Sequence, residues 1–146
     1  MTPDDVPDGP LALDTDVFSF LLMSKGRHSD FAPLVAGHPY VLPFPVVGEL
    51  KVLPLRAGSR WSARRTQALE EAIGRCVVIP STAAVVDQWA QLYARFRGRL
   101  KNGGVNDIWA AACCLAHAVP LVTANLTDFQ TIAGEFPTLQ LVHPDL

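Results

Sequence analysis

Four acidic residues that lie far apart in the sequence have the chemistry of one metal site. Asp14 follows a short apolar run, Glu49 stands alone among aliphatic residues, Asp107 precedes a run of small residues, and Asp128 belongs to the last Asp-Phe pair. Hard divalent cations such as Mg²⁺ take oxygen ligands, usually a few carboxylates together with waters and substrate phosphates. Four carboxylates packed together repel one another unless such ions are bound. The pattern therefore predicts a site where metal activates water for hydrolysis, with two ions about 4 Å apart as one arrangement.

The segment from Gly103 to Phe129 is expected to position two of these acids. The Gly103-Gly104 pair should end whatever precedes it, Asn106 is a good N-cap residue, and Asp107 then falls in the first turn of a helix. A short apolar strand at 121–123 and a loop carrying Asn125 and Asp128 should follow. The helix is indicated by apolar residues at helical spacing, namely Ile108, Ala111, Ala112, Leu115 and Ala116.

The remaining chain alternates in the same way between short apolar strands and amphipathic helices. Strands are expected at 11–13, 40–42, 76–79, 121–123 and 139–142, and helices at 17–23, 29–35, 46–53, 60–75 and 82–96. This order predicts an α/β sandwich with a mostly parallel sheet of four or five strands flanked by helices. Ligands of such sheets bind outside the carboxyl ends of the strands, which is where the acids should gather.

Composition limits the classes to consider. With 146 residues and 49% hydrophobic content, the chain suits one domain, and no apolar run reaches the roughly 18 residues that span a bilayer, so no membrane association is expected. Residues 1–10 are acidic and proline-rich and are expected to form a disordered tail, followed by a single domain over 11–146. The three cysteines lie in apolar contexts without zinc-site spacing, which favours the reducing cytoplasm.

Each acid also has a simpler explanation. Asp14 and Asp107 could serve only as helix-terminal charges, Glu49 could face solvent, and Asp128 could be an ordinary loop residue whose role falls to Asn125. The charge balance favours a polyanionic substrate. The chain has 12 basic and 14 acidic residues, and without the four candidates and the three acids of the tail, 12 basic residues face seven acidic ones. The basic clusters at 60–65 and 95–101 could grip phosphates, although a charged helix face is usually only solvated.

The motifs LALDTDVFSFLL, VVGELKVL and NDIWAAACCLAHAVPLVTANLTDF resemble the PIN domain, and within it the VapC toxins of toxin–antitoxin modules. The resemblance covers nearly everything from Leu11 to Val142 and implies a three-layer PIN-like sandwich. It further implies an endoribonuclease that depends on Mg²⁺ or Mn²⁺, is usually dimeric, and is inhibited by a small antitoxin. On this resemblance, Asp14, Glu49, Asp107 and Asp128 are the catalytic and metal-binding acids.

The resemblance also assigns auxiliary residues. Thr123 would orient the acids by hydrogen bonding. Many relatives carry Asn where this chain has Asp16, which raises the charge near the first acid, and some carry Asp where it has Asn125. The position of Ala124 is often Arg, so that this chain lacks one phosphate or carboxylate contact.

Surface composition gives the expected partners. The apolar stretches 18–22 and 52–53, together with Trp61, exceed what a monomer of this size comfortably buries, which predicts a homodimer. An antitoxin segment is expected in an apolar groove near these helices, and the family resemblance adds a basic antitoxin side chain facing the acidic pocket.

Three other functions remain open at this point. Asp14-Thr15-Asp16-Val17 is similar to the opening motif of haloacid-dehalogenase-like phosphatases, although Phe18 and the acid pattern near the end of the chain fit that family poorly. The chain could also be a free-standing PIN nuclease in RNA processing, or a PIN-like module that only binds a partner. Metal-dependent RNA cleavage by the purified protein separates a nuclease from the binding module.

Overall fold

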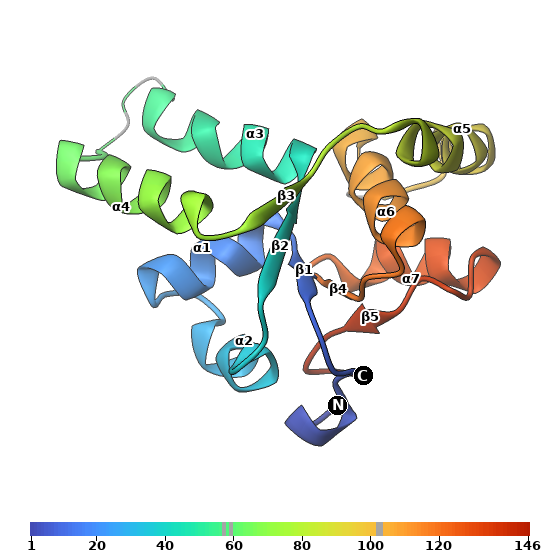
Figure 1. The fold of residues 1–146 in the computed structure, drawn as a ribbon, viewed down its shortest axis with the longest axis horizontal. Coiled ribbons are helices and arrows are strands. Elements are labelled where there is room, and N and C mark those ends of the chain that lie inside the picture. Colours follow the sequence, from blue (N-terminus) through green and yellow to red (C-terminus); the bar gives the residue numbers. More distant parts are fainter. Residues whose placement is uncertain (57, 59, 102–103) are drawn as a thin grey trace.

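A parallel sheet forms the centre of the molecule (Figure 1). The computed structural model describes residues 1–56, 58, 60–101 and 104–146. Within this part of the chain, the strands are β1 (Leu11–Leu13), β2 (Tyr40–Pro43), β3 (Val77–Ile79), β4 (Leu121–Val122) and β5 (Leu141–Val142). Their order in the sheet is β3-β2-β1-β4-β5, and every pairing is parallel. The α/β class and the five-stranded sheet expected from the alternating pattern are confirmed.

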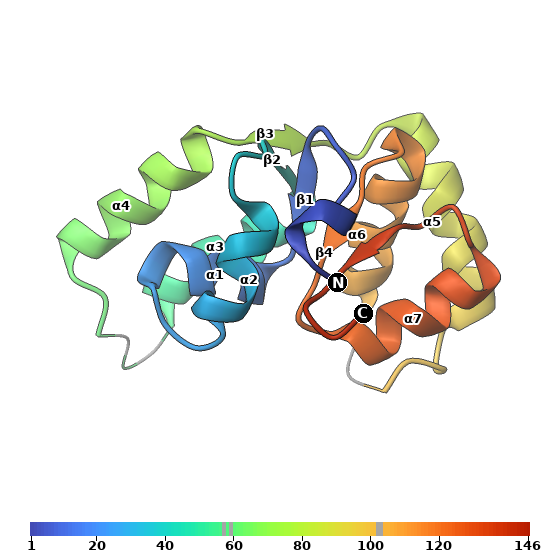
Figure 2. The same cartoon turned by 90° about the horizontal axis from the view of Figure 1, so that it is seen from below.

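Helices cover both faces of the sheet, which gives three layers. One layer holds α1 (Thr15–Met23), α2 (His28–Val35), α3 (Phe44–Val52) and α4 (Ala63–Gly74). The other holds α5 (Ala83–Phe96), α6 (Val105–His117) and α7 (Leu126–Glu135). The views in Figures 1 and 2 agree on this division, with α1–α4 on one side of the strands and α5–α7 on the other.

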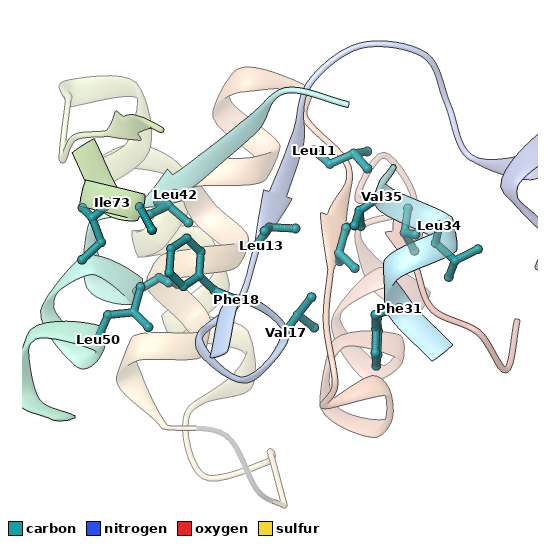
Figure 3. Close-up of a cluster of buried hydrophobic side chains, with 14 of the residues drawn as sticks. Leu11, Leu13, Val17, Phe18, Phe31, Leu34, Val35, Leu42, Leu50 and Ile73 are labelled. Atoms are coloured by element: carbon teal, nitrogen blue, oxygen red, sulfur yellow. The ribbon is translucent and has the colours of Figure 1, made fainter. Parts of the chain in front are cut away.

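Each layer has its own apolar core. Figure 3 shows the first, where Leu11 and Leu13 of β1 meet Val17 and Phe18 of α1, and Phe31 of α2 packs nearby. The second core lies beneath α5, α6 and α7. There Trp89 of α5 stacks on Trp109 of α6 with ring centroids 4.7 Å apart, which fixes α6, the helix that begins near Asp107. Because both faces of the strands are covered, the strands read as uninterrupted apolar runs.

The two chain ends meet beside the sheet, as both cartoon views show. Residues 1–10, predicted to be a disordered tail, contain the 3-10 helix Pro3–Asp5, which begins after Thr2. Val6 is buried against the first core, and the amino group of Met1 donates to the carbonyl oxygen of Leu146. This ordered segment differs from the expected tail; Val6, the Met1 contact and a hydrogen bond between the His38 ring and the Gly9 carbonyl hold it against the domain.

Several element boundaries also differ from the sequence expectations. The helix expected at 17–23 begins at Thr15, and its N-cap is Asp14 rather than Thr15 or Asp16. In α6 the N-cap position is Gly104, so Asn106 lies inside the helix and is not its cap. The loop expected around Asp128 is wrong, because Asn125 occupies the position before α7 and Asp128 lies in that helix's first turn.

Two further features bear on the expectations. No described helix is long and apolar enough to cross a membrane. The three cysteines are free thiols.

Candidate active site

The site is built where the strand order reverses direction. The chain runs outward from β1 through β2 to β3 and then returns to place β4 on the other side of β1. The carboxyl ends of β1 and β4 therefore open into the crevice where ligands bind in open α/β sheets. Asp14 immediately follows β1, and Thr123 immediately follows β4.

Asp14 joins these two strand ends through a carboxylate that accepts three hydrogen bonds. Its Oδ1 accepts a hydrogen bond of 2.9 Å from the backbone N–H of Val17, which caps α1. Its Oδ2 accepts the hydroxyl of Thr123 at 2.6 Å and the backbone N–H of Ala124 at 3.0 Å. Asp14 therefore has the capping contact that the simpler explanation required, and it also stands at the site.

Glu49 reaches the same pocket from α3. That helix follows β2 directly, so its first turns start at the carboxyl end of the sheet (Figure 1). Thr15 of α1 donates its hydroxyl to Glu49 Oε1 at 3.1 Å, which links α1 to α3. The half-buried Glu49 side chain lines the same pocket as Asp14.

Asp107 and Asn125 form a hydrogen-bonded wall of the same pocket. The amide Nδ2 of Asn125 donates to Asp107 Oδ2 and to Asp128 Oδ2, each at 3.1 Å. The backbone N–H of Asn125 donates to the Thr123 hydroxyl at 2.9 Å, so the amide is fixed from the same residue that holds Asp14. One chain of hydrogen bonds therefore connects Asp14, Thr123, Asn125 and Asp107.

Asp128 lies behind this wall. Its side chain is 1% exposed, and its Oδ1 accepts the backbone N–H of Lys101 at 2.8 Å. Asp128 consequently connects the segment between α5 and α6 to Asn125, and it is absent from the residues that line the pocket. Asn125, in contrast, does line it.

The pocket itself is open and has a volume of about 570 Å³. Four carboxylates line it, namely those of Asp14, Asp16, Glu49 and Asp107, together with Thr15, Ser19 and Arg56. Sequence reasoning singled out the carboxylates but not Ser19 or Arg56. The helix expected at 46–53 ends before Arg56, so helical spacing gave no signal for it.

Two of the acids have strongly altered acidity. Burial raises the pKa of Asp14 to about 6, against opposing hydrogen bonds from Thr123 and the backbone. Burial also raises the pKa of Asp107 to about 6; the bond from Asn125 opposes the shift, and the charges of Glu49, Asp128 and Asp16 reinforce it. These groups are therefore charged at neutral pH only at a free-energy cost, which a bound cation would remove.

The donor set fits a hard divalent ion held partly through water. Among the described residues, no three carboxylate, histidine or cysteine side chains converge closely enough to ligate one ion together. Mg²⁺ keeps several waters and needs only one or two carboxylates directly, so that the pocket has room for a hydrated ion. Its carboxylate and amide oxygens are the kind of donor that such an ion prefers.

Fold and site together define a class of protein. The PIN domain model matches residues 11–135, and the chain belongs to the PIN domain family.

Within this family the chain is similar to toxins of the VapC type. Ribonuclease VapC4 of Mycobacterium tuberculosis is 27% identical over 112 residues, which cover 77% of this chain and 83% of that protein. Two solved structures share the fold. VapBC2 from Rickettsia felis, bound to a DNA fragment from its promoter, has a TM-score of 0.72 at 20% identity, covering 91% of this chain and 97% of that one. VapBC-1 from nontypeable Haemophilus influenzae has a TM-score of 0.71 at 21% identity, covering 94% and 99%.

Proposed function

We propose that this protein is a metal-dependent endoribonuclease and the toxin of a toxin–antitoxin pair. The observation that carries the proposal is the pocket at the β1–β4 switch point, where Asp14, Glu49 and Asp107 come together from three separate elements. Membership of the PIN family and the similarity to a protein named as a ribonuclease support RNA as the substrate.

Asp14, Glu49 and Asp107 would hold Mg²⁺ or Mn²⁺ partly through bound waters, with Asp16 adding negative charge to the same pocket. A divalent ion supplies Lewis acidity and a water of lowered pKa at such a site. The protein's own part is to hold the acids in place: Thr15 fixes Glu49, while Thr123 and the Ala124 N–H fix Asp14. No covalent enzyme intermediate is part of this proposal, since hydrolysis by water needs no protein nucleophile.

Asp128 and Asn125 have different roles in this proposal. Asn125 lines the pocket beside Asp107, and its amide would face the substrate. The buried Asp128, predicted from the sequence as a fourth metal-binding acid, contributes by fixing the Asn125 amide and by adding negative charge behind Asp107. Asp128 therefore acts in catalysis indirectly, by positioning Asn125.

The proposed partners are RNA, a small antitoxin and a second copy of the chain. An apolar pocket of about 690 Å³ between α1, α2 and α4 is lined by Leu13, Phe18, Leu21 and Leu22. We place an antitoxin segment there, supported by the solved VapBC toxin–antitoxin complexes that share the fold. A basic antitoxin side chain facing the acidic pocket and a homodimer complete the proposal, and the reducing cytoplasm remains the expected compartment.

The test is cleavage of RNA by the purified protein with and without chelation. Cutting should require free Mg²⁺ or Mn²⁺ and stop in EDTA. Cleavage that survives chelation would contradict the metal-dependent mechanism. For the partner, co-expression with the neighbouring small reading frame should give a complex on sizing, and a lone monomer that ignores that product would exclude the antitoxin.

A further inference from the structure

Arg56 is the one cation among the described residues that line the acidic pocket. It lies directly after the short 3-10 helix Leu53–Leu55, which continues α3, and its backbone N–H donates to the carbonyl of Val52 at 3.1 Å. Glu49, Leu53 and Arg56 therefore follow one face of this helical segment, and all three line the pocket.

The guanidinium of Arg56 has no partner in the described part of the chain. No ion pair or side-chain hydrogen bond joins it to a described residue, although Asp14, Asp16, Glu49 and Asp107 line the same pocket. In contrast, Arg95 and Arg99 both pair with Glu135, and Arg27 pairs with Asp30. An unpaired arginine beside an acidic site has its hydrogen-bonding fork available for a ligand with negatively charged oxygens.

We propose that Arg56 binds a backbone phosphate of the RNA substrate next to the phosphate that is cleaved. This inference rests on the nuclease function proposed above. Arginine's planar fork matches two phosphate oxygens at once, and Ala124, which lines the same pocket, adds no charge there. Arg56 gives the RNA chain a fixed positive contact at the edge of an otherwise acidic site.

The distance along α3 and the 3-10 helix after it distinguishes the neighbouring phosphate from the cleaved one. Arg56 follows Glu49 by seven residues, which corresponds to roughly 10–12 Å along this helical segment. If Glu49 lies at the reacting phosphate, Arg56 contacts the next phosphate along the RNA chain. Its main effect should therefore be on substrate binding, and it is a positioning residue rather than a catalytic one.

Charge on the adjoining segment continues this path outward. Arg60, Arg64 and Arg65 are all exposed, and the sequence from Arg56 to Arg65 contains no acidic residue. The guanidinium of Arg65 lies 5.2 Å from the centre of the Trp61 ring, which holds it at the start of α4. These exposed arginines give the segment that follows Arg56 in the sequence a positive charge, which favours RNA.

The experiment compares Arg56→Gln with wild type and with the control Arg75→Gln, an exposed arginine at the other end of α4. Steady-state cleavage of a single-stranded RNA oligonucleotide should show KM raised roughly tenfold to hundredfold by Arg56→Gln, with kcat nearly unchanged. The salt dependence of binding should weaken by about 0.7 in log–log slope, as for one lost phosphate contact. Arg56→Lys should recover part of the affinity, since it restores charge without the fork.

A neutral substrate analogue tests the contact itself. A methylphosphonate at the phosphate flanking the cleavage site should reproduce the KM loss in wild type and add nothing in Arg56→Gln. The role of Arg56 would be overturned if Arg56→Gln and Arg75→Gln had equal KM values. It would also be overturned if the losses from Arg56→Gln and from the analogue added up at either flanking position. In both cases, cleavage by wild type would leave the proposed nuclease function unaffected. A wild type that does not cleave RNA would instead remove the proposed function.

Discussion

Replacing Asp107 with Asn separates a role in metal binding from a role in stability. Asn is nearly the same shape, and its side-chain oxygen can still accept the Asn125 amide that now bonds to Asp107 Oδ2 at 3.1 Å. The substitution mainly removes one negative charge from a pocket lined by four carboxylates. It therefore tests whether that charge lowers the stability of the fold without metal and is required for metal binding.

The magnitude follows from the pKa of Asp107, raised from 3.8 to about 6. A folded-state pKa above the unfolded value means that the stabilising contribution is complete below about pH 4 and is lost as pH rises through about 6. Two pKa units correspond to roughly 3 kcal/mol as an upper bound. The neutral Asn avoids this loss but gives up a helix-dipole interaction of about 0.3–1 kcal/mol. At pH 8 in EDTA the variant should be more stable by about 2 kcal/mol, a melting temperature several degrees higher.

Divalent metal should reverse this order. Wild type should gain about 2.7 kcal/mol of stability at a hundredfold excess of metal over its dissociation constant, and Asp107→Asn should gain much less. Thermal melts at pH 4 and pH 8, in EDTA and in Mg²⁺, measure these differences. The matched control is Asp87→Asn, at an exposed position on α5, which should behave as wild type throughout. An Asp107→Asn variant that is less stable at pH 8 in EDTA and still shows the full metal gain would refute the reasoning.

Three further changes test the hydrogen bonds that build the site. Thr123→Val removes the donor to Asp14 and the acceptor for the Asn125 N–H, so urea unfolding should show a loss of about 1–3 kcal/mol together with much lower cleavage; unchanged stability would contradict the bonding described. Asp128→Ala removes an acceptor from the Lys101 N–H and from the Asn125 amide, so the melting temperature should fall in EDTA and in Mg²⁺ alike. A lower melting temperature in Mg²⁺ alone would instead make Asp128 a direct metal ligand. Asp14→Asn places an amide N–H against the Ala124 N–H or the Val17 N–H, so the variant should be less stable although a charge is removed. A melting temperature above that of wild type at pH 8 would exclude this contact between two donors.

Much of the fold could be predicted because its strands are buried on both faces. Runs such as Leu11-Ala12-Leu13 have no polar position, and their alternation with amphipathic segments indicates a parallel sheet. The start of α5 could also be predicted, because Thr82 is a preferred N-cap residue, and its hydroxyl accepts the Val85 N–H. The helix α7 was missed because Leu126-Thr127-Asp128-Phe129 has weak helical preference, and its stability comes from the burial of Phe129 and Ile132.

The site was predictable in its residue types but not in its connections. Asp14 follows a parallel strand, Asp107 lies in the first turn of a helix, and Glu49 lies on the helix that follows β2, so topology brings them to one edge. The division of roles between Asn125 and Asp128 depends on which way two side chains three residues apart point at the start of α7. The same holds for Arg56, whose importance appears only when the helix that carries Glu49 is seen to continue past Pro54.

The central claim is that the pocket at the β1–β4 switch point cleaves RNA, and Glu49→Gln tests it most directly. Gln keeps an oxygen that can accept the Thr15 hydroxyl, which now donates to Glu49 Oε1 at 3.1 Å, so the link between α1 and α3 should survive. The measurement is the rate at which wild type and variant cut one labelled single-stranded RNA in Mg²⁺, at equal concentration and with matching thermal melts in EDTA. The account predicts a fall on the order of a hundredfold or more with the fold intact. A Glu49→Gln protein that cuts the RNA as fast as wild type would contradict it.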